Sequence, residues 1–487
     1  MNTKLGITFD KGNVERVQQF LQLGFDRNCH DENGLCQLCN AVNDGNFELT
    51  KILVENGAEV NKKCCCIAPL YCAINNLDKT MVEYLIANGA NTEVTFGHNG
   101  VTGLMVACKI GREAEEIAMT LLISGANPNS RDLKGYTPLM YAALSWSGSG
   151  RIIDYLVKYG ADVNVVNKLK ETALHMAVAS SLNGDVITRI ATQLGDVNGT
   201  DILGRTALFI LCSLGEAADC KMVDMLLGLK ADVVIVKTTK NGWTPLMAAC
   251  NSGCNENVLK MLVEKGSNVN ATNYLGFTPL MLTCKEAQPE QVKLLIDNGA
   301  DLNMANKMGK TALSIHCSGN RRRSRRKDPL KVAKLLIENG ANVNVSSDYP
   351  LMRAIKCRDL PMTNFLLDYG ATVRLENSVN LIEIAIDSIQ YNLDDLPFLL
   401  KRLHFWGSDL SNECLAKLLR KFQNQTIETL FQSIIPINSN VHLIKSTSSD
   451  AVFGRIGRNS RNRIFLMKSF MENRQVQEHL CHYLEVS

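Results

Sequence analysis

The sequence is short of aromatic residues and contains no long uncharged hydrophobic run. Phe, Trp and Tyr make up 6% of the 487 residues, which argues against a large all-β sandwich. No apolar stretch reaches the roughly 18 residues that a helix needs to cross a bilayer. Residues 1–20 include Asp10, Lys11, Glu15 and Arg16, so a secretory signal peptide is not expected. The 17 cysteines are therefore expected to be reduced, as in a cytoplasmic or nuclear protein.

The common sequence motifs of enzymes are also missing. The chain has no H-E-x-x-H, G-x-S-x-G or G-x-G-x-x-G motif. Gly309-Lys310-Thr311 resembles the end of a phosphate-binding loop, but Met304 stands where that loop needs glycine. The net charge is +3, and composition alone predicts neither nucleic-acid nor membrane binding. We expect a folded, non-enzymatic protein with no catalytic residues and no cofactor.

Internal repetition is the strongest signal that is present. A tripeptide close to Gly-Ala-Asp recurs, mostly 30–37 residues apart. Its copies begin at Gly57, Gly89, Gly125, Gly160, Gly266, Gly299, Gly340 and Gly370, with weaker copies at Gly24, Gly195, Ala231 and Gly407. In the seventh copy Lys230 replaces the glycine, which predicts backbone strain or a changed helix end.

A second motif, Gly-x-Thr-Pro/Ala-Leu, follows many of these tripeptides. It is found at 135–139, 204–208, 242–246, 276–280 and 309–313. Its Thr is a suitable N-cap, and Pro is favoured at the first helical position, where no backbone donor is needed. A second amphipathic stretch such as 257–263 then ends at a glycine. Each unit is therefore expected to be a turn and two antiparallel helices, stacked on its neighbours.

This pattern resembles the ankyrin repeat, whose period is about 33 residues and whose motif includes T-P-L-H-x-A. The resemblance covers residues 6–410, or about twelve repeats. It implies an all-α ankyrin solenoid with short turn or hairpin tips. We assign residues 1–410 to the array, with a basic insertion at 318–328. We assign residues 411–487 to a helical C-terminal cap or docking region.

In this family, partners usually contact the turn tips and the inner helices. Apolar residues are unexpected at exposed tips, so those found there are the predicted partner-binding residues. They are Leu133, Tyr136, Ile202, Leu203, Trp243, Tyr274, Phe277 and Met308. For the leucines, packing between neighbouring tips explains the pattern equally well. The resemblance also implies that His175 bonds to backbone between repeats, and it makes Asn164, Asn270 and Asn344 similar to hydroxylated asparagines.

Two clusters were weighed as separate sites. Cys36-x-x-Cys39 resembles half a zinc site, but Cys64, Cys65 and Cys66 do not supply the other half at a suitable spacing. Cys29 and His30 lie nearby, yet no metal is expected, and Cys64–Cys66 are placed at an exposed turn as oxidisable thiols. The basic insertion is a solvated loop, a nuclear-import signal or a phosphorylation site at Ser324. Its residues are Arg321, Arg322, Arg323, Ser324, Arg325, Arg326 and Lys327.

The favoured function is a scaffold or adaptor that binds a protein partner through its tips and inner helices. The alternative is a substrate-recognition adaptor of a ubiquitin ligase, with residues 411–487 docking ligase subunits. An enzyme site in the C-terminal region and nucleic-acid binding through the arginine insertion have less support. The composition predicts no membrane partner.

Overall fold

The computed structural model describes most of the predicted repeat array. The described residues are 28, 34–64, 67–145, 147–148, 150–180, 184–234, 241–318, 329–344, 349–373, 381, 384 and 385. The chain divides into two compact units, residues 1–268 and 269–487. The predicted C-terminal region at 411–487 and residues 319–328 of the basic insertion lie outside the described residues.

The first unit consists of helix pairs joined by short turns. Its helices are α2 (Gln37–Asn43), α3 (Phe47–Glu55), α4 (Pro69–Asn75), α5 (Lys79–Ala87), α6 (Gly103–Ile110), α7 (Glu115–Ile123), α8 (Pro138–Ala143), α9 (Gly150–Lys158), α10 (Ala173–Ser180), α11 (Gly184–Gln193), α12 (Ala207–Ser213), α13 (Cys220–Gly228), α14 (Pro245–Ser252) and α15 (Glu256–Glu264). Two 3-10 turns, η1 (Arg112–Ala114) and η2 (Gly215–Ala217), and a short hairpin of β1 (Thr95–Phe96) and β2 (Val101–Thr102) complete it.

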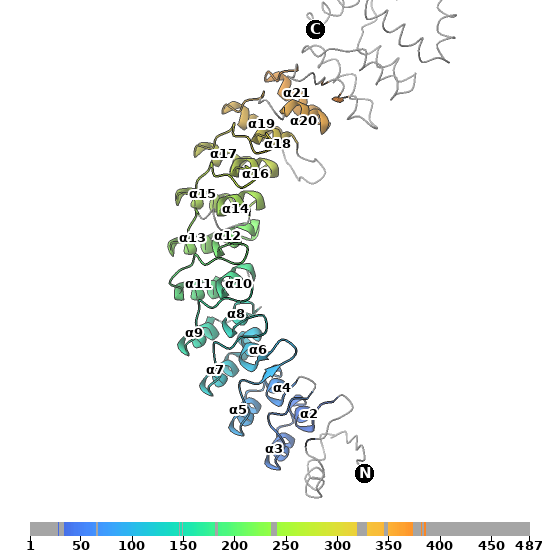
Figure 1. The fold of residues 1–487 in the computed structure, drawn as a ribbon, viewed down its shortest axis with the longest axis vertical. Coiled ribbons are helices and arrows are strands. Elements are labelled where there is room, and N and C mark those ends of the chain that lie inside the picture. Colours follow the sequence, from blue (N-terminus) through green and yellow to red (C-terminus); the bar gives the residue numbers. More distant parts are fainter. Residues whose placement is uncertain are drawn as a thin grey trace, which may run out of the picture. The chain divides into compact units, whose positions relative to one another are not determined.

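The second unit continues the same alternation. Its described helices are α16 (Pro279–Glu286), α17 (Pro289–Asp297), α18 (Ala312–Cys317), α19 (Pro329–Glu338), α20 (Pro350–Lys356) and α21 (Leu360–Asp368). Within each unit, even-numbered helices pack on even-numbered helices and odd-numbered helices on odd-numbered ones (Figure 1). This two-row stack confirms the predicted all-α solenoid.

The predicted helix starts are confirmed at the described repeats. The Oγ1 atom of Thr244 accepts the N–H of Met247 at 3.1 Å, and Pro245 is the first residue of α14. Thr137 and Thr278 start α8 and α16 in the same way. The side-chain oxygen satisfies a backbone donor that has no partner inside the helix, so each repeat begins its inner helix at a fixed residue.

The core between the rows is built from one leucine of each motif and a small residue one turn later. Leu139 and Leu246 are both at most 1% exposed. The cysteines predicted to pack four residues after the motif leucine are all buried: Cys108, Cys212, Cys250, Cys284 and Cys317. A thiol is small enough for the contact between neighbouring inner helices, which explains why cysteine replaces alanine there.

Most of the described outer helices are followed by a residue with left-handed backbone conformation. Gly160 and Gly266 have φ of 88° and 89°. Lys230 takes the equivalent place with φ of 63°, so the strain predicted at this position is confirmed and the repeat keeps its turn. The stack therefore tolerates one unfavourable residue rather than changing its register.

Candidate interaction surface

Five of the described tips are five-residue turns held by the side chain of the first residue. We call this turn the tip and count its residues from one to five, ending just before the Thr cap. In the tip that starts at Asp132, Oδ1 accepts the N–H groups of Lys134 and Tyr136 at 2.9 and 2.7 Å. Asn167, Asn273, Asn306 and Asp201 make the same two bonds in their own tips. A short polar side chain can do this because it reaches back to its own loop.

Neighbouring tips are also joined through their backbones. The N–H of the second tip residue donates to a carbonyl of the preceding tip, over 2.8–3.1 Å. In the first unit, the donor–acceptor pairs are Leu133 with Asn99, Lys168 with Lys134, and Ile202 with Leu169; in the second unit, the pair is Lys307 with Leu275. These bonds fix the spacing of successive tips within each unit.

A glycine at the fourth tip position lets the next tip approach closely. A Cβ atom on Gly276 would lie 2.9 Å from the backbone nitrogen of Lys307, and Gly276 has φ of 79°. Gly135 also meets the following tip, with 3.3 Å to the Cα atom of Asn167. Lys170 occupies this position in the next tip with φ of 59°. The tip glycines therefore serve both backbone conformation and close contact between repeats.

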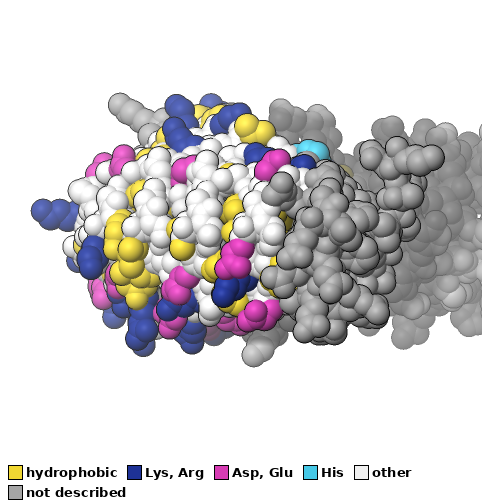
Figure 2. Space-filling model, turned by 90° about the horizontal axis from the view of Figure 1, so that it is seen from below, with side chains coloured by type: hydrophobic (Ala, Val, Ile, Leu, Met, Phe, Trp, Pro, Cys, Tyr) yellow, Lys and Arg dark blue, Asp and Glu magenta, His cyan; other side chains and the backbone are white. Residues whose placement is uncertain are grey.

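The second and third tip residues direct their side chains into solvent. Leu133 is 63% exposed and Ile202 is 49% exposed, and Leu203, Tyr274 and Met308 are exposed as well. Tyr136, Trp243 and Phe277 are half-buried. These three aromatic residues are therefore less accessible than their tip position suggested. On the face drawn in Figure 2, hydrophobic side chains reach the surface in short stretches that charged and polar residues separate.

Two exposed tip leucines were not among the predicted residues. Leu169 is 50% exposed and Leu275 is 60% exposed. Leu169 was missed because Lys170 hides the glycine motif of its tip. The five-residue spacing from Asn167 to Thr172 is the signal that would have revealed this tip.

Tyr136 also has a structural role inside its tip. Its ring centroid lies 5.8 Å from that of Tyr141, whose hydroxyl donates to Oδ2 of Asp132 at 2.9 Å. Burial raises the pKa of Tyr136 above the ordinary value for tyrosine. Replacing Tyr136 would therefore disturb the tip as well as its surface.

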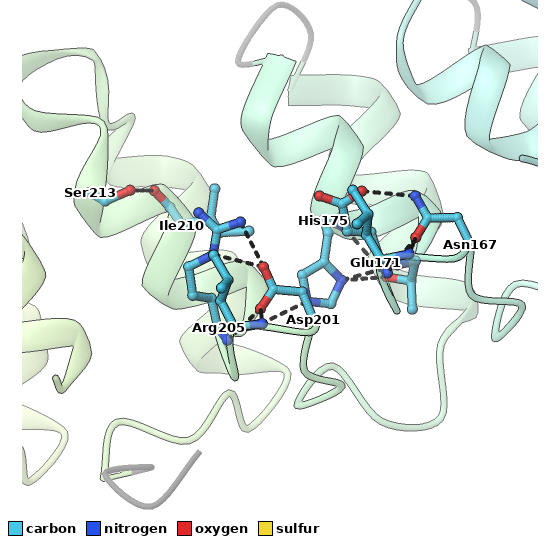
Figure 3. A network of polar contacts seen from close by, with 10 residues as sticks. Asn167, Glu171, His175, Asp201, Arg205, Ile210 and Ser213 are labelled. Carbon is cyan, nitrogen blue, oxygen red and sulfur yellow. Dashed lines mark hydrogen bonds and ion pairs between the residues drawn. The ribbon is translucent and has the colours of Figure 1, made fainter. Parts of the chain in front are cut away.

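Beneath the tips, His175 links two repeats as the family resemblance implied. Its Nδ1 accepts the N–H of Thr172 at 3.3 Å, and its Nε2 lies 3.0 Å from the carbonyl oxygen of Arg205 in the next repeat (Figure 3). Because Nδ1 is an acceptor, the proton sits on Nε2 and is donated to that carbonyl. Burial lowers the pKa of His175, which favours the neutral ring. This ring has a structural task.

A second link uses an asparagine in the turn that follows several of the outer helices. Nδ2 of Asn129 donates to the carbonyl of Gly160 at 2.8 Å, and its Oδ1 accepts the N–H of Asp162 at 2.8 Å. Asn61, Asn198, Asn270, Asn303 and Asn344 make the same pair of bonds. Asn270 and Asn344, which the resemblance made similar to hydroxylated asparagines, are thus links between repeats.

The N-terminal cysteines differ from their predicted arrangement in one respect. Cys36 caps α2, and Cys39 follows three residues later in that helix. Cys64 was placed at an exposed turn, but it is 1% exposed. It pairs with Ile67 in an antiparallel bridge, so it occupies the buried first position of a shortened tip. Cys29, His30, Cys65 and Cys66 lie outside the described residues.

Stacked helix pairs with linked tips define a repeat solenoid that presents a regular surface. The chain belongs to the ankyrin repeat family. The family model, three copies of the ankyrin repeat, matches in overlapping windows that run from residues 5–96 to residues 280–377.

Several known proteins share this repeat region. The chain is 25% identical over 304 residues to the human transient receptor potential cation channel subfamily A member 1, a match covering 53% of this chain and 26% of the channel. It is 28% identical over 171 residues to YahD of Escherichia coli K12, named as an ankyrin repeat protein, covering 34% and 84% of the two chains. It is 22% identical over 279 residues to the Arabidopsis thaliana E3 ubiquitin-protein ligase KEG, covering 54% and 17%. The chain therefore spans only a small part of the channel and of the ligase.

The structure does not test one predicted site. The residues of the basic insertion, Arg321 to Lys327, lie outside the described residues.

Among the helices that the structure describes, none combines the length and the hydropathy that a membrane span requires.

Proposed function

We propose that this protein is a non-enzymatic scaffold or adaptor that binds a protein partner through its tips. The observation that carries the proposal is the series of exposed apolar side chains on consecutive, hydrogen-bonded tips. In the first unit Leu133, Leu169 and Ile202 stand on three successive tips. Exposed apolar groups on a rigid frame lose little conformational entropy on binding, which favours protein recognition.

The polar residues beneath the tips support the same proposal. His175 is occupied by a bond that joins two repeats, and Asp201 is occupied by bonds within its own tip, where its Oδ2 accepts from Nε of Arg205 at 2.7 Å. Their polar side chains are explained by the packing of the repeats, and no catalytic role is needed to account for them. The similar proteins share the repeats with this chain. The activities of those whole proteins are not part of the proposal.

The test is affinity capture with a tip variant and a matched control. In the variant, Leu133, Leu169 and Ile202 are replaced by Ser. The control is Ile123→Ser, because Ile123 is 64% exposed but ends the outer helix α7. We expect the control to retain the proteins captured by the unchanged chain and the tip variant to lose them. Identical capture by all three chains would reject the tip surface.

A double variant, Trp243→Ala with Phe277→Ala, tests the aromatic tip residues in the same assay. Both side chains are half-buried, so circular dichroism must first show that the variant is folded. Loss of capture by a folded variant would add these two residues to the proposed surface. Capture of a cullin complex that disappears when 411–487 is deleted would favour the ubiquitin-ligase adaptor instead.

The proposal also places the protein in the cytoplasm or the nucleus, with the basic insertion as an import signal. Arg321, Arg322, Arg323, Arg325, Arg326 and Lys327 supply six positive charges. Replacing all six with Ala should shift the protein out of the nucleus if they form the signal. An unchanged distribution in cells would reject the import role while leaving the tip surface untouched.

A further inference from the structure

Three buried cysteines converge where the first two described repeats meet. The Sγ atoms of Cys36, Cys39 and Cys64 all lie within 4.8 Å of one another. Each residue is at most 2% exposed, and none is in a disulfide. We call these three residues the cysteine cluster. Among the described residues, no other three cysteines lie this close together.

The repeat geometry explains the convergence. Cys36 is an N-cap, Cys39 lies three residues later, and Cys64 is the first tip residue of the following repeat. The residues in these positions at the junction of Figure 3 are Thr172, His175 and Asp201. There a hydroxyl, an imidazole and a carboxylate serve a polar network between two repeats. In the cysteine cluster, sulfur replaces all three polar groups.

Thiols make a poor substitute for that polar network. Cys39 donates its backbone N–H to Sγ of Cys36 at 3.4 Å, and sulfur is a weak acceptor. The cluster therefore gains little stability from hydrogen bonding alone.

A fourth cysteine lies against the cluster. Cys72, in α4, is 6% exposed, and its thiol is a hydrogen-bond partner of Cys39. Two of the four cysteines belong to the repeat of α2 and two to the repeat that contains α4. Sulfur ligands from both repeats are thus within reach of one point.

We propose that the cysteine cluster binds a Zn²⁺ ion, with Cys36, Cys39 and Cys64 as ligands and Cys72 as the fourth. Thiolates are soft ligands that suit Zn²⁺, and structural zinc sites close with four ligands in a tetrahedron. With Zn–S bonds of about 2.3 Å, the sulfur atoms of a tetrahedral site lie about 3.8 Å apart. The sulfur atoms of Cys36, Cys39 and Cys64 already lie within 4.8 Å of one another, so small side-chain rotations bring them to that spacing, and Cys72 is held beside them by its hydrogen bond with Cys39.

Binding would exchange protons for the metal. Each ligating thiol gives its S–H proton to solvent, and its sulfur then forms a bond to Zn²⁺; no oxidation is involved. The ion would connect the first two described repeats, where later junctions use hydrogen bonds. Because the sulfur atoms are buried, the metal is expected to enter while this part of the chain folds.

The test measures zinc in the full-length protein, purified under a phosphine reductant, refolded from urea in the presence of zinc chloride and desalted. We expect about one zinc per chain, as in a closed structural site. The double variant Cys36→Ser/Cys39→Ser and the single variant Cys64→Ser should lose it. Cys108→Ser is the matched control, because Cys108 is a buried cysteine of α6 outside the cluster, and it should keep its zinc.

Further arms separate this site from other ligands in the chain. Cys65→Ser/Cys66→Ser should keep its zinc, whereas Cys72→Ser should lose it faster to a chelator. Cobalt in place of zinc should give the intense absorption of thiolate-to-cobalt charge transfer, which surface histidines do not produce. Zinc far below one per chain, or zinc unchanged in the Cys36/Cys39 variant, would overturn the proposal.

If a cysteine variant fails to fold, the proposal can still be tested on the unchanged protein. Thiol alkylation followed by peptide mass spectrometry compares the folded chain with and without zinc during slow unfolding in urea. We expect zinc to protect Cys36, Cys39 and Cys64 but not Cys108. Equal alkylation of the cluster in both samples would also overturn the proposal.

Discussion

The Nε2 atom of His175 lies 3.0 Å from the carbonyl oxygen of Arg205, and this contact joins two repeats through a single neutral ring. The other ring nitrogen is already used by Thr172, which fixes the tautomer. A proton added to Nδ1 would replace an acceptor by a donor and break the bond to the backbone of Thr172. The junction is therefore sensitive to the protonation of one side chain.

The first prediction is a loss of stability in mild acid that depends on His175. Its pKa in the folded protein is lowered, chiefly by burial, so the unfolded chain binds the proton more tightly. The contribution of neutral His175 to the free energy of unfolding is complete above about pH 6.5, the ordinary pKa of histidine. It is lost as the pH falls below that value. Urea unfolding at pH 7.5 and pH 5 measures it.

His175→Met is the control, because Met140 and Met247 fill the same repeat position and are buried. The difference in unfolding free energy between the two pH values should be smaller in this variant than in the unchanged chain. An equal difference in both chains would show that other groups cause the acid sensitivity.

The second prediction concerns the left-handed residues that end the outer helices. Lys230→Gly should raise the free energy of unfolding by about 1 kcal/mol, because a side chain at φ of 63° is strained. Gly266→Ala should lower it by about the same amount. A Cβ atom on Gly266 would meet nothing within 4 Å, so this cost is conformational. A destabilised Lys230→Gly variant would contradict the explanation.

The third prediction tests the asparagine links. Asn129→Ala removes two hydrogen bonds to the next repeat and should cost about 1 kcal/mol of stability. Asn88→Ala is the comparison, since Asn88 bonds only to Tyr84 one turn earlier in the same repeat. Urea unfolding of the two variants should show the larger loss for Asn129. Equal losses would mean that the link adds nothing beyond local structure.

The fourth prediction separates core leucines from tip leucines. Leu139→Ala should cost about 2–5 kcal/mol, because the side chain is 1% exposed between helices. Leu133→Ala should change stability by less than about 0.5 kcal/mol, since Leu133 is 63% exposed. Thermal unfolding of both variants checks this contrast, and comparable shifts would place Leu133 in a packing role.

Much of the fold could be predicted because its rules are local. Thr before Pro fixes where an inner helix begins, and glycine after an amphipathic stretch fixes where an outer helix ends, as at Thr244 and Gly266. The repeat period then determines which helices pack against one another. The family assignment followed from these positions.

The surface and the cysteine cluster were harder to predict. Lys170 adopts the glycine conformation, so the tip bearing Leu169 carried no motif. Cys64 looked exposed because its tip is one residue shorter than the others, and only the paired backbone shows it to be buried. Its neighbours Cys36 and Cys39 come from the preceding repeat, and ligands drawn from two repeats match no short sequence pattern. The boundary at residue 410 and the role of 411–487 stay predictions.

The backbone bonds between tips reach only from one repeat to the next. An end repeat can therefore fray while the interior of its unit keeps every bond it had, and unfolding need not be all-or-none. The rate of amide hydrogen exchange should then vary along the chain, and the amide of Leu133 should exchange more slowly than amides near the ends of the array. A protein built this way can lengthen or shorten by whole repeats during evolution without redesigning the contacts that remain.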